Sequence, residues 1–382
     1  MKKISIISNS AFNIYNFRLT LAEEIIKKGY ELFFIAPYDE FTSKIIDKGF
    51  VIKNVSVNPK GSNIIEDKKT IDEFKRIFRV YSPDLILNFT IKPNIYATLA
   101  ASSLNIPAIN TVTGLGTVFI KENFVTDIVE ILYKISFSKA TKIFFQNYHD
   151  RDLFIKKNIV KKECTGIVPG SGVDTIRFFP REKRKNRDKF VFLLIGRMLK
   201  DKGLEEYIEA AKIIKKRYDN VEFQLLGSLE VENKTLISKK KMYEWVRNGT
   251  VSYLGSTFKV EDYIADADCV VLPSYREGLP KSLLEGASMQ KPLIATDVVG
   301  CIDVVKDGFN GFLCEAKSSE SLAQACEKML LLDKKSRFLM GENGRKLVLD
   351  KFDEKFIIKT YLDEIQKVVP HKLKFRLKYK LA

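Results

Sequence analysis

The chain has 382 residues, of which 45% are hydrophobic and 29% charged, and its formal net charge is +16. This length favours two domains over one hydrophobic core, and the composition is that of an ordinary soluble globular protein. No run of about 18 uncharged apolar residues occurs, which excludes a membrane-spanning helix. The five cysteines lack Cys-x-x-Cys spacing, so we expect reduced thiols rather than a disulfide framework.

Strands and helices alternate over the first part of the chain. The apolar patterns and glycine stops predict strands over residues 4–8, 31–36, 51–55, 85–88, 108–111 and 142–146, and helices over residues 17–28, 41–48, 70–80, 95–103 and 122–138. This alternation indicates a doubly wound parallel sheet, in which the carboxyl ends of the strands lie along one edge.

The loop after the first strand, residues 8–18, lacks the glycine-rich fingerprint of dinucleotide-binding proteins, which argues against a Rossmann dehydrogenase. Asn9 lies in this loop, Arg18 follows on the first helix, and Lys92 follows the strand at 85–88. We expect both basic residues near the carboxyl edge of the sheet, where either can pair with a phosphate or remain solvated.

A second series of strands begins after the charged stretch 181–189. We predict strands over residues 190–195, 222–226, 250–253, 268–272 and 292–295, with helices between them and a final helix over 354–368. The domain boundary is expected near residues 166–174, a loop rich in glycine and proline. The fold class is therefore α/β, with two doubly wound parallel sheets.

The most informative segment is Pro273-Ser-Tyr-Arg-Glu277-Gly-Leu-Pro280-Lys-Ser-Leu-Leu-Glu285. Glu277 follows an apolar strand, Pro280 suits the first position of a helix, and Glu285 falls on its second turn. Free amides at a helix start favour phosphate, and the two carboxylates accept hydrogen bonds from hydroxyl groups. A nucleotide sugar needs this combination, whereas two solvated glutamates are the alternative reading.

The segment and its surroundings resemble the signature of retaining glycosyltransferases of the GT-B fold, family 4. The resemblance is dense over residues 160–360 and rests also on Gly196-Arg197, Lys202-Gly203, Tyr253-Leu-Gly255, Lys291-Pro292 and Asp307-Gly308. It implies two Rossmann-like domains that face each other across a cleft. The implied domains are an acceptor-binding domain (1–168), a nucleotide-sugar-binding domain (169–352), a helix that crosses back to the first domain (353–370) and a basic tail (371–382).

The resemblance also implies roles for individual residues. Arg197 and Lys202 are expected to clamp the leaving diphosphate, and Glu277 to face the donor sugar. Glu285 is expected to accept hydrogen bonds from the ribose, with the rest of the donor site lined by Gly196, Gly255, Gly278 and Leu279. The acceptor candidates are Asn9, Arg18, Lys92 and Thr113. Many relatives carry a histidine where this chain has the loop 111–116, and Thr113 is the candidate there.

No cofactor and no metal ion are expected beside the nucleotide-sugar substrate. The chain has two histidines, His149 and His371, which offers little material for a zinc site or a Ser-His-Asp triad. Asp266-Ala-Asp268 precedes a buried strand and reads as a capping pair. Retention needs no carboxylate nucleophile if the acceptor attacks from the face that the diphosphate leaves.

One subgroup of the family resembles the chain further, in the Tyr-x-Phe-Arg element before Leu19, in the loop 113–116 and in Gly300-Cys301. Its members add an acetamido sugar, such as N-acetylgalactosamine, to undecaprenyl-diphosphate-linked saccharides at the cytoplasmic membrane. We therefore expect a retaining hexosyltransferase that uses a UDP-linked sugar and a lipid-diphosphate-linked saccharide in polysaccharide or glycan biosynthesis. The alternatives are a nucleotide-sugar 2-epimerase of the same fold and a non-catalytic nucleotide-sugar-binding subunit.

The net charge points to a polyanionic partner, either nucleic acid or an anionic membrane surface. The tail 371–382 mixes basic residues with Leu, Phe and Tyr, as suits a lipid headgroup layer, or forms a solvated tail. The apolar helix predicted at 125–138 is either a membrane-dipping or a buried core helix. No RNA-binding signature accompanies the charge, so we expect a cytoplasmic protein peripherally associated with the membrane and no nucleic acid partner.

Overall fold

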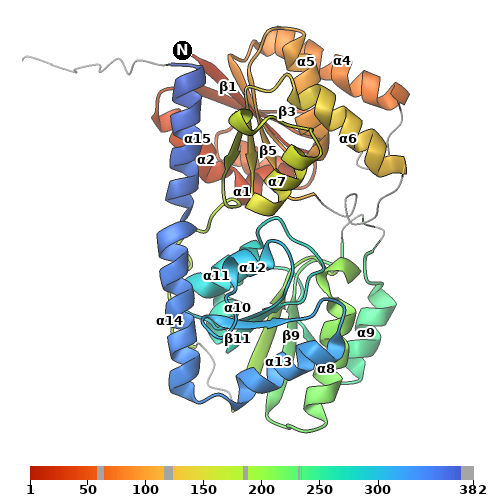
Figure 1. Cartoon of the computed structure of the whole chain (residues 1–382), viewed down its shortest axis with the longest axis vertical. Coiled ribbons are helices and arrows are strands. Elements are labelled where there is room, and N and C mark those ends of the chain that lie inside the picture. The colour runs from red at the N-terminus through yellow and green to blue at the C-terminus, as the bar shows by residue number, and fades with distance from the viewer. Residues whose placement is uncertain (58–63, 116–123, 184–187, 231–232, 234, 371–382) are drawn as a thin grey trace, which may run out of the picture. The chain divides into compact units, whose positions relative to one another are not determined.

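The computed structural model describes residues 1–57, 64–115, 124–183, 188–230, 233 and 235–370 (Figure 1). The chain divides into two compact units. The first unit comprises Met1–Ser171 together with Ile357–Ala382, and the second comprises Gly172–Phe356. The predicted tail, 371–382, lies outside the described residues.

The described strands of the first unit form a seven-stranded sheet in which every pairing is parallel. The strand order is β3-β2-β1-β4-β5-β6-β7. The strands are β1 (Lys3–Ile7), β2 (Glu31–Ile35), β3 (Ile52–Lys53), β4 (Leu85–Phe89), β5 (Ala108–Val112), β6 (Lys142–Phe145) and β7 (Thr165–Ile167). Strand β4 is buried along its whole length, as expected when helices cover both faces of a parallel sheet.

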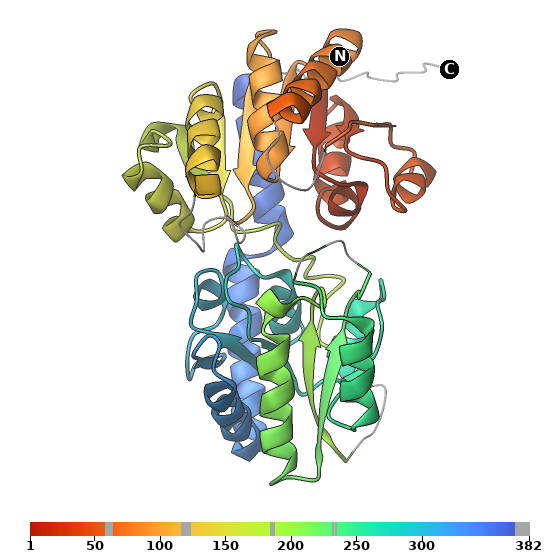
Figure 2. The same ribbon diagram turned by 90° about the vertical axis from the view of Figure 1, so that its right-hand side faces the viewer.

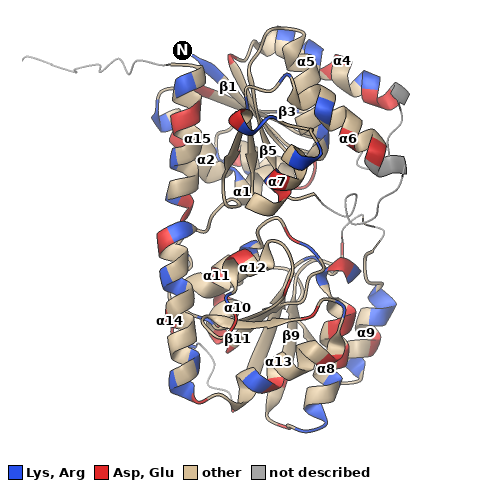
Figure 3. Ribbon diagram, viewed as in Figure 1, with Lys and Arg blue, Asp and Glu red and all other residues tan. Residues whose placement is uncertain are grey.

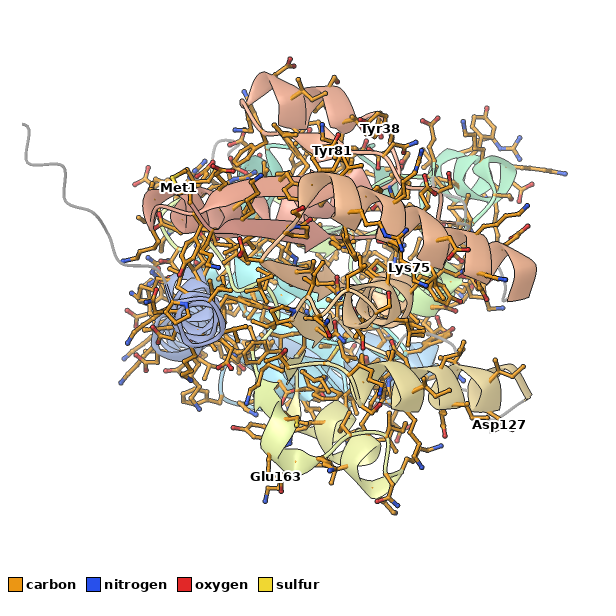
Figure 4. The ribbon with its side chains drawn as sticks, turned by 90° about the horizontal axis from the view of Figure 1, so that it is seen from above. Met1, Tyr38, Lys75, Tyr81, Asp127 and Glu163 are labelled. Carbon is orange, nitrogen blue, oxygen red and sulfur yellow. The ribbon has the colours of Figure 1, made fainter. Side chains whose placement is uncertain are left out.

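Helices cover both faces of this sheet (Figure 2). One face packs against α1 (Ala11–Phe17), α2 (Leu19–Lys27), α3 (Thr42–Asp47) and α15 (Glu354–Val368). The other packs against α4 (Ile64–Tyr81), the π-helix η1 (Pro93–Ala97), α5 (Thr98–Ser102), α6 (Phe124–Phe137) and α7 (Tyr148–Lys156). Figure 4, a view from above, shows α15 end-on, with Lys75 on α4 and Asp127 at the outer end of α6.

The last helix belongs to the first unit from Ile357 onward. Ile357, Tyr361 and Ile365 recur at the spacing of one helix face and are buried in the same core as β1, β4 and α1. The bounds of α15, Glu354–Val368, confirm the final helix predicted from the sequence.

The described strands of the second unit form a six-stranded parallel sheet with the order β10-β9-β8-β11-β12-β13. The strands are β8 (Phe190–Ile195), β9 (Val221–Leu226), β10 (Ser252–Tyr253), β11 (Cys269–Leu272), β12 (Leu293–Thr296) and β13 (Gly311–Cys314). The order reverses direction between β8 and β11. Ligands of open α/β sheets bind at the carboxyl ends of strands at such a point.

The faces of the second sheet are covered in the same way. One face packs against α8 (Leu204–Lys215), α9 (Lys239–Arg247) and α13 (Ser319–Leu331), and the other against α10 (Val260–Asp266), α11 (Lys281–Ser288), α12 (Cys301–Val304) and α14 (Lys334–Lys351). In Figure 2, α8 stands in front of the sheet and α14 behind it.

The prediction that residues 8–18 form a loop was wrong for most of the segment. Helix α1 occupies Ala11–Phe17, and the Ser10 side chain caps it by accepting a hydrogen bond from the Asn13 amide at 3.1 Å. Ala11 and Ile14 lie three residues apart and are buried, which is the signal that the sequence interpretation overlooked. Arg18 therefore does not lie within a first helix but at the junction of α1 and α2.

Candidate functional site

The loops that follow β8, β11 and β12 are joined by hydrogen bonds at the carboxyl edge of the second sheet. The carbonyl oxygen of Asp201 accepts hydrogen bonds from the Tyr275 amide at 3.0 Å and the Ser274 hydroxyl at 3.1 Å. The Glu277 amide donates to the Val299 carbonyl oxygen at 3.2 Å. Because β8 and β11 are neighbours, these bonds hold the residues after both strands in fixed positions.

Glycine permits the loops to approach this closely. A Cβ on Gly203 would lie 2.0 Å from the carbonyl oxygen of Pro273, and one on Gly300 would lie 2.6 Å from that of Glu277. A Cβ on Gly227 would lie 1.7 Å from the Gly196 carbonyl oxygen. Gly203 also has φ +72°, a conformation that glycine adopts without steric cost. Gly203 and Gly300 belong to the motifs named above, whereas no sequence motif marks Gly227, and the close approach of these loops is visible only in the structure.

The predicted catalytic residues Lys202 and Glu277 form an ion pair, although 75 residues separate them in the chain. The Lys202 ammonium contacts Glu277 Oε1, and their side chains are 20% and 13% exposed. Lys202 ends the short 3₁₀-helix η4 (Lys200–Lys202), and Glu277 lies in the loop after β11. A cation at this edge can stabilise negative charge on a leaving group. Arg197 lies two residues after β8 and is exposed.

Glu285 lies on the second turn of α11, as the sequence predicts, and is buried. Burial is the main cause that raises the pKa of its carboxyl group, whereas Lys281 and Arg177 lower it. The Lys281 ammonium lies 3.8 Å from Glu285 Oε1. Pro280 precedes the helix rather than beginning it. A buried carboxylate with few partners can accept hydrogen bonds from a pair of hydroxyl groups.

The remaining predicted donor residues lie along the same edge. Gly196 follows β8, its amide donating to the Leu226 carbonyl oxygen at 3.0 Å. Gly255 follows β10 with φ +72°, and its carbonyl oxygen accepts a bond from the Gly227 amide at 2.7 Å. Gly278 and Leu279 are half-buried between Glu277 and α11. The predicted donor residues therefore follow strands β8, β10 and β11 of one sheet, in loops or, for Glu285, on the helix after β11.

The predicted acceptor residues lie in the first unit, after strands β1, β4 and β5. Asn9 is exposed two residues after β1, and Thr113 is half-buried directly after β5. Lys92 follows β4, and its ammonium lies 3.8 Å from Asp67 Oδ1. Desolvation lowers the pKa of Lys92 despite Asp67. Arg18 is buried against Phe89, the last residue of β4.

Two further features of the described residues bear on metals and other ligands. No group of three or more His, Cys, Asp or Glu side chains in these residues is placed to hold a metal ion. A cavity of about 1100 Å³ lies at the opposite, amino edge of the second sheet. Three of the basic residues that line it have partners within the protein: Lys291 donates to the Ala265 carbonyl oxygen, Arg337 donates to that of Leu330, and Lys183 pairs with Asp268. The predicted donor residues are not among the residues that line this cavity.

Two family models match the chain in series. Residues 3–147 match the model "Glycosyl transferase 4-like", and residues 175–347 match "Glycosyl transferases group 1". The first match covers the strands β1 to β6, and the second contains Arg197, Lys202, Glu277 and Glu285.

Curated relatives of similar length act on lipid-linked saccharides. The chain is 28% identical over 383 residues to N,N'-diacetylbacillosaminyl-diphospho-undecaprenol alpha-1,3-N-acetylgalactosaminyltransferase of Campylobacter jejuni, a match covering 96% of this chain and 99% of the relative. It is 26% identical to UDP-Gal:alpha-D-GlcNAc-diphosphoundecaprenol alpha-1,3-galactosyltransferase of Escherichia coli, over 76% of this chain and 77% of the relative.

The fold is shared with solved structures at lower sequence identity. The structure of Anabaena HepE in complex with UDP and glucose superposes with a TM-score of 0.77 and 15% identity, covering 96% of this chain and all of that one. At 15% sequence identity, this structural similarity shows a shared fold and nothing more.

Proposed function

We propose that this chain, a hexosyltransferase of the GT-B fold with a glycosyl transferase 4-like and a group 1 domain, is a retaining enzyme. It moves an acetamido hexose from a UDP-linked donor to a lipid-diphosphate-linked saccharide. The Campylobacter and Escherichia relatives support the acceptor class, because both names specify a diphospho-undecaprenol saccharide. The first of them also supports an acetamido sugar.

The observation that carries the proposal is the ion pair of Lys202 with Glu277, which lies in the loop leading to the helix of the buried Glu285. Cleavage of the bond between the anomeric carbon and the β-phosphate leaves negative charge on the diphosphate. Lys202 and Arg197 supply positive charge for it, and the amides of Gly278 and Leu279 supply hydrogen-bond donors. Glu285 accepts hydrogen bonds from the ribose hydroxyls of the nucleotide.

Glu277 has two roles in this proposal. It pairs with the Lys202 ammonium, and we expect it to accept hydrogen bonds from donor-sugar hydroxyls when the diphosphate of the donor competes for Lys202. Retention then follows if the acceptor hydroxyl attacks from the face that the diphosphate leaves, with a phosphate oxygen accepting the proton. This route needs no metal ion and no carboxylate nucleophile.

We also propose a peripheral association with an anionic membrane surface at the cytoplasmic side. In the described part of the chain, no helix is both long and apolar enough to cross a bilayer. Figure 3 shows Lys and Arg spread over the helices of both units. On α6, Ile131 and Ile135 are 58% and 49% exposed and lie one helical turn apart. Lys134 on the same helix and Lys139, two residues after its end, are also exposed. Exposed apolar side chains among cations suit a headgroup layer.

The function can be tested by nucleotide release from the purified protein. A panel of nucleotide sugars is supplied with and without a detergent-dispersed undecaprenyl-diphosphate saccharide. We expect release of UDP from one acetamido-hexose donor only when the acceptor is present. Conversion of the donor to an epimer without acceptor would favour the 2-epimerase. Binding of the donor without turnover under any acceptor would favour a non-catalytic subunit.

A further inference from the structure

The two cations at the acceptor edge of the first unit differ in their electrostatic partners. Lys92 has Asp67 at 3.8 Å. Arg18 has no acidic partner within 4.0 Å among the described residues, and its Nε lacks a hydrogen-bond partner there. Its guanidinium carbon lies 3.8 Å from the centre of the Phe89 ring, so the side chain stacks on an aromatic face.

The Arg18 side chain is also buried, with 4% of the residue exposed. Desolvation lowers the pKa of its guanidinium to about 10, which leaves the group charged near neutral pH. A buried charge without an opposite charge or a full set of hydrogen bonds destabilises a fold. At the carboxyl edge of a parallel sheet, where ligands of such folds bind, a negatively charged ligand can supply the missing charge.

Two hydroxyl groups on the residues next to Phe89, one on the neighbouring strand and one in the chain, also lack hydrogen-bond partners in the described structure. Ser8 directly follows β1, and the pairing of Ile7 with Asn88 places it next to Phe89 on the neighbouring strand. Thr90 follows Phe89 and has φ +74°, a strained conformation for a β-branched residue. The Oγ of Ser8 and the Oγ1 of Thr90 are buried and unpaired in the described structure. Hydroxyl and guanidinium donors together suit a phosphoryl group.

The C-terminal helix supports the ring on which Arg18 lies. Tyr361 of α15 packs edge-on against Phe89, with ring centres 5.8 Å apart, and against Phe144 at 5.3 Å. Its hydroxyl forms a hydrogen bond of 2.8 Å with Thr111 Oγ1 at the end of β5. Tyr361 therefore connects α15 with β5 and holds in place the Phe89 ring on which the Arg18 guanidinium stacks.

We propose that Arg18 binds a phosphoryl oxygen of the lipid-diphosphate acceptor, and that Tyr361 positions Arg18 through Phe89. This inference rests on the proposed function and goes further, since it assigns the phosphate contact to Arg18 rather than Lys92 and includes the last helix in the acceptor site. The donor also carries a diphosphate, so the test must separate the two sources.

The test uses Arg18→Met, which keeps the apolar stem and removes the charge. We expect kcat/KM for the lipid-linked acceptor to fall about tenfold to a hundredfold, as for a lost charge-assisted hydrogen bond, while KM for the donor stays unchanged. We also expect Tm to rise by a few degrees, because an uncompensated buried charge is gone. Arg76→Met is the control, since Arg76 is a surface residue with its side chain 74% exposed.

Three results would overturn the assignment. Unchanged acceptor kinetics would show that Arg18 does not contact the acceptor. A raised KM for the donor alone would give the phosphoryl group to the donor. A lower Tm, with partial recovery in Arg18→Lys, would make Arg18 a structural cation. These results differ from a failure of the proposed function, in which the unsubstituted protein itself shows no acceptor-dependent release.

The positioning role of Tyr361 has a separate test. Tyr361→Phe keeps the ring and removes the hydroxyl that bonds Thr111. We expect a rise of a few-fold in KM for the acceptor, no change in KM for the donor, and no further loss when Tyr361→Phe is combined with Arg18→Met. Additive losses in the double variant would show that Tyr361 acts independently of Arg18.

Discussion

At the scale of single residues, Lys202 has the most direct part in the proposed chemistry. Lys202→Ala removes the cation expected to stabilise the leaving diphosphate, so turnover should fall about a hundredfold, the usual effect of losing one such group. Lys200→Ala is the matched control, because Lys200 is in the same 3₁₀-helix, pairs with Glu205 at 3.0 Å and has its side chain 56% exposed. Acceptor-dependent nucleotide release measures both variants.

Equal rates for Lys202→Ala and Lys200→Ala would remove Lys202 from the site. The distinction matters because alanine at position 202 also leaves Glu277 without its ion-pair partner. A purely structural role would lower Tm and the yield of folded protein but leave kcat per folded enzyme unchanged. The proposed role predicts a fall in kcat per folded enzyme.

Glu285 links donor binding to stability. Burial raises the pKa of its carboxyl group in the folded chain. At pH values between the unfolded and the folded pKa, the folded chain therefore binds more protons than the unfolded chain. The stability of the fold then falls as pH rises through this range. Glu285→Gln should therefore raise Tm by about 2–4 °C at neutral pH, the effect of about 1 kcal/mol. It should also raise KM for the donor.

The pH dependence gives the sharper check on Glu285. The Tm values of the Glu285→Gln variant and the unsubstituted protein should converge below about pH 4.3, the ordinary pKa of glutamate. Below this pH the Glu285 carboxyl is protonated in both the folded and the unfolded chain. A Tm difference that is constant with pH, or that grows at acid pH, would contradict the assignment of the raised pKa to Glu285.

At the scale of elements, the close approach of η4 to the loop after β11 depends on Gly203. Gly203→Ala should cost about 1–2 kcal/mol for its positive φ and about 1–3 kcal/mol more for the contact with Pro273. Gly249 has a similar φ, +68° against +72°, but open space around its Cβ position. Gly249→Ala therefore isolates the first cost, and denaturant unfolding of both variants measures the difference.

Gly203→Ala should also raise KM for the donor, because Lys202 is the preceding residue. Equal destabilisation by Gly203→Ala and Gly249→Ala would mean that the loop moves aside at no cost, and that the glycine is not required for the site.

Helix α6 makes a prediction about membrane association. Replacing Ile131 and Ile135 by Glu should reduce sedimentation with vesicles that contain anionic lipid by about tenfold, since two apolar contacts become charges of the wrong sign. Ile46→Glu on α3 is the control, because Ile46 is 53% exposed but lies on a helix of the opposite sheet face. Unchanged binding of the α6 variant would leave the membrane contact to other parts of the chain.

The elements themselves could largely be read from the sequence. Strand β8 has the bounds predicted from its apolar run, Phe190–Ile195, and α15 those predicted from its spacing. The sequence did not predict α7, β7 and β13, and it did not predict α1. Helix α1 has seven residues, and its cap and two buried positions give a weak local signal. Short helices of this kind depend on packing, here on the same core as β1 and β4, more than on their own propensity.

The site could be predicted only as a set of residues, not as an arrangement. The sequence places Glu277 in a strand-to-helix loop and Lys202 one loop after β8, but their ion pair depends on the register of β8 with β11. Likewise, nothing local marks Tyr361 as a neighbour of Phe89, 272 positions earlier, because tertiary packing alone brings α15 to β4. The unpaired hydroxyls of Ser8 and Thr90 are visible only once their surroundings are known.

At the scale of the whole molecule, each unit presents one set of chemical groups at the carboxyl edge of its sheet. The second unit gathers cations, helix-start amides and buried carboxylates, which suit a nucleotide sugar. The first unit gathers an unpaired guanidinium and hydroxyl groups, which suit a phosphorylated acceptor. Under the proposed function, the second unit binds the nucleotide-sugar donor and the first unit binds the lipid-linked acceptor.

The most direct test of this account is the mass and anomeric configuration of the product. The protein is incubated with a UDP-linked acetamido hexose and an undecaprenyl-diphosphate saccharide, and the acceptor is analysed by mass spectrometry and by NMR of the new linkage. The account predicts an acceptor heavier by one acetamido-hexose residue, joined with the anomeric configuration of the donor. An unchanged acceptor across the donor panel, or a linkage of inverted configuration, would contradict it.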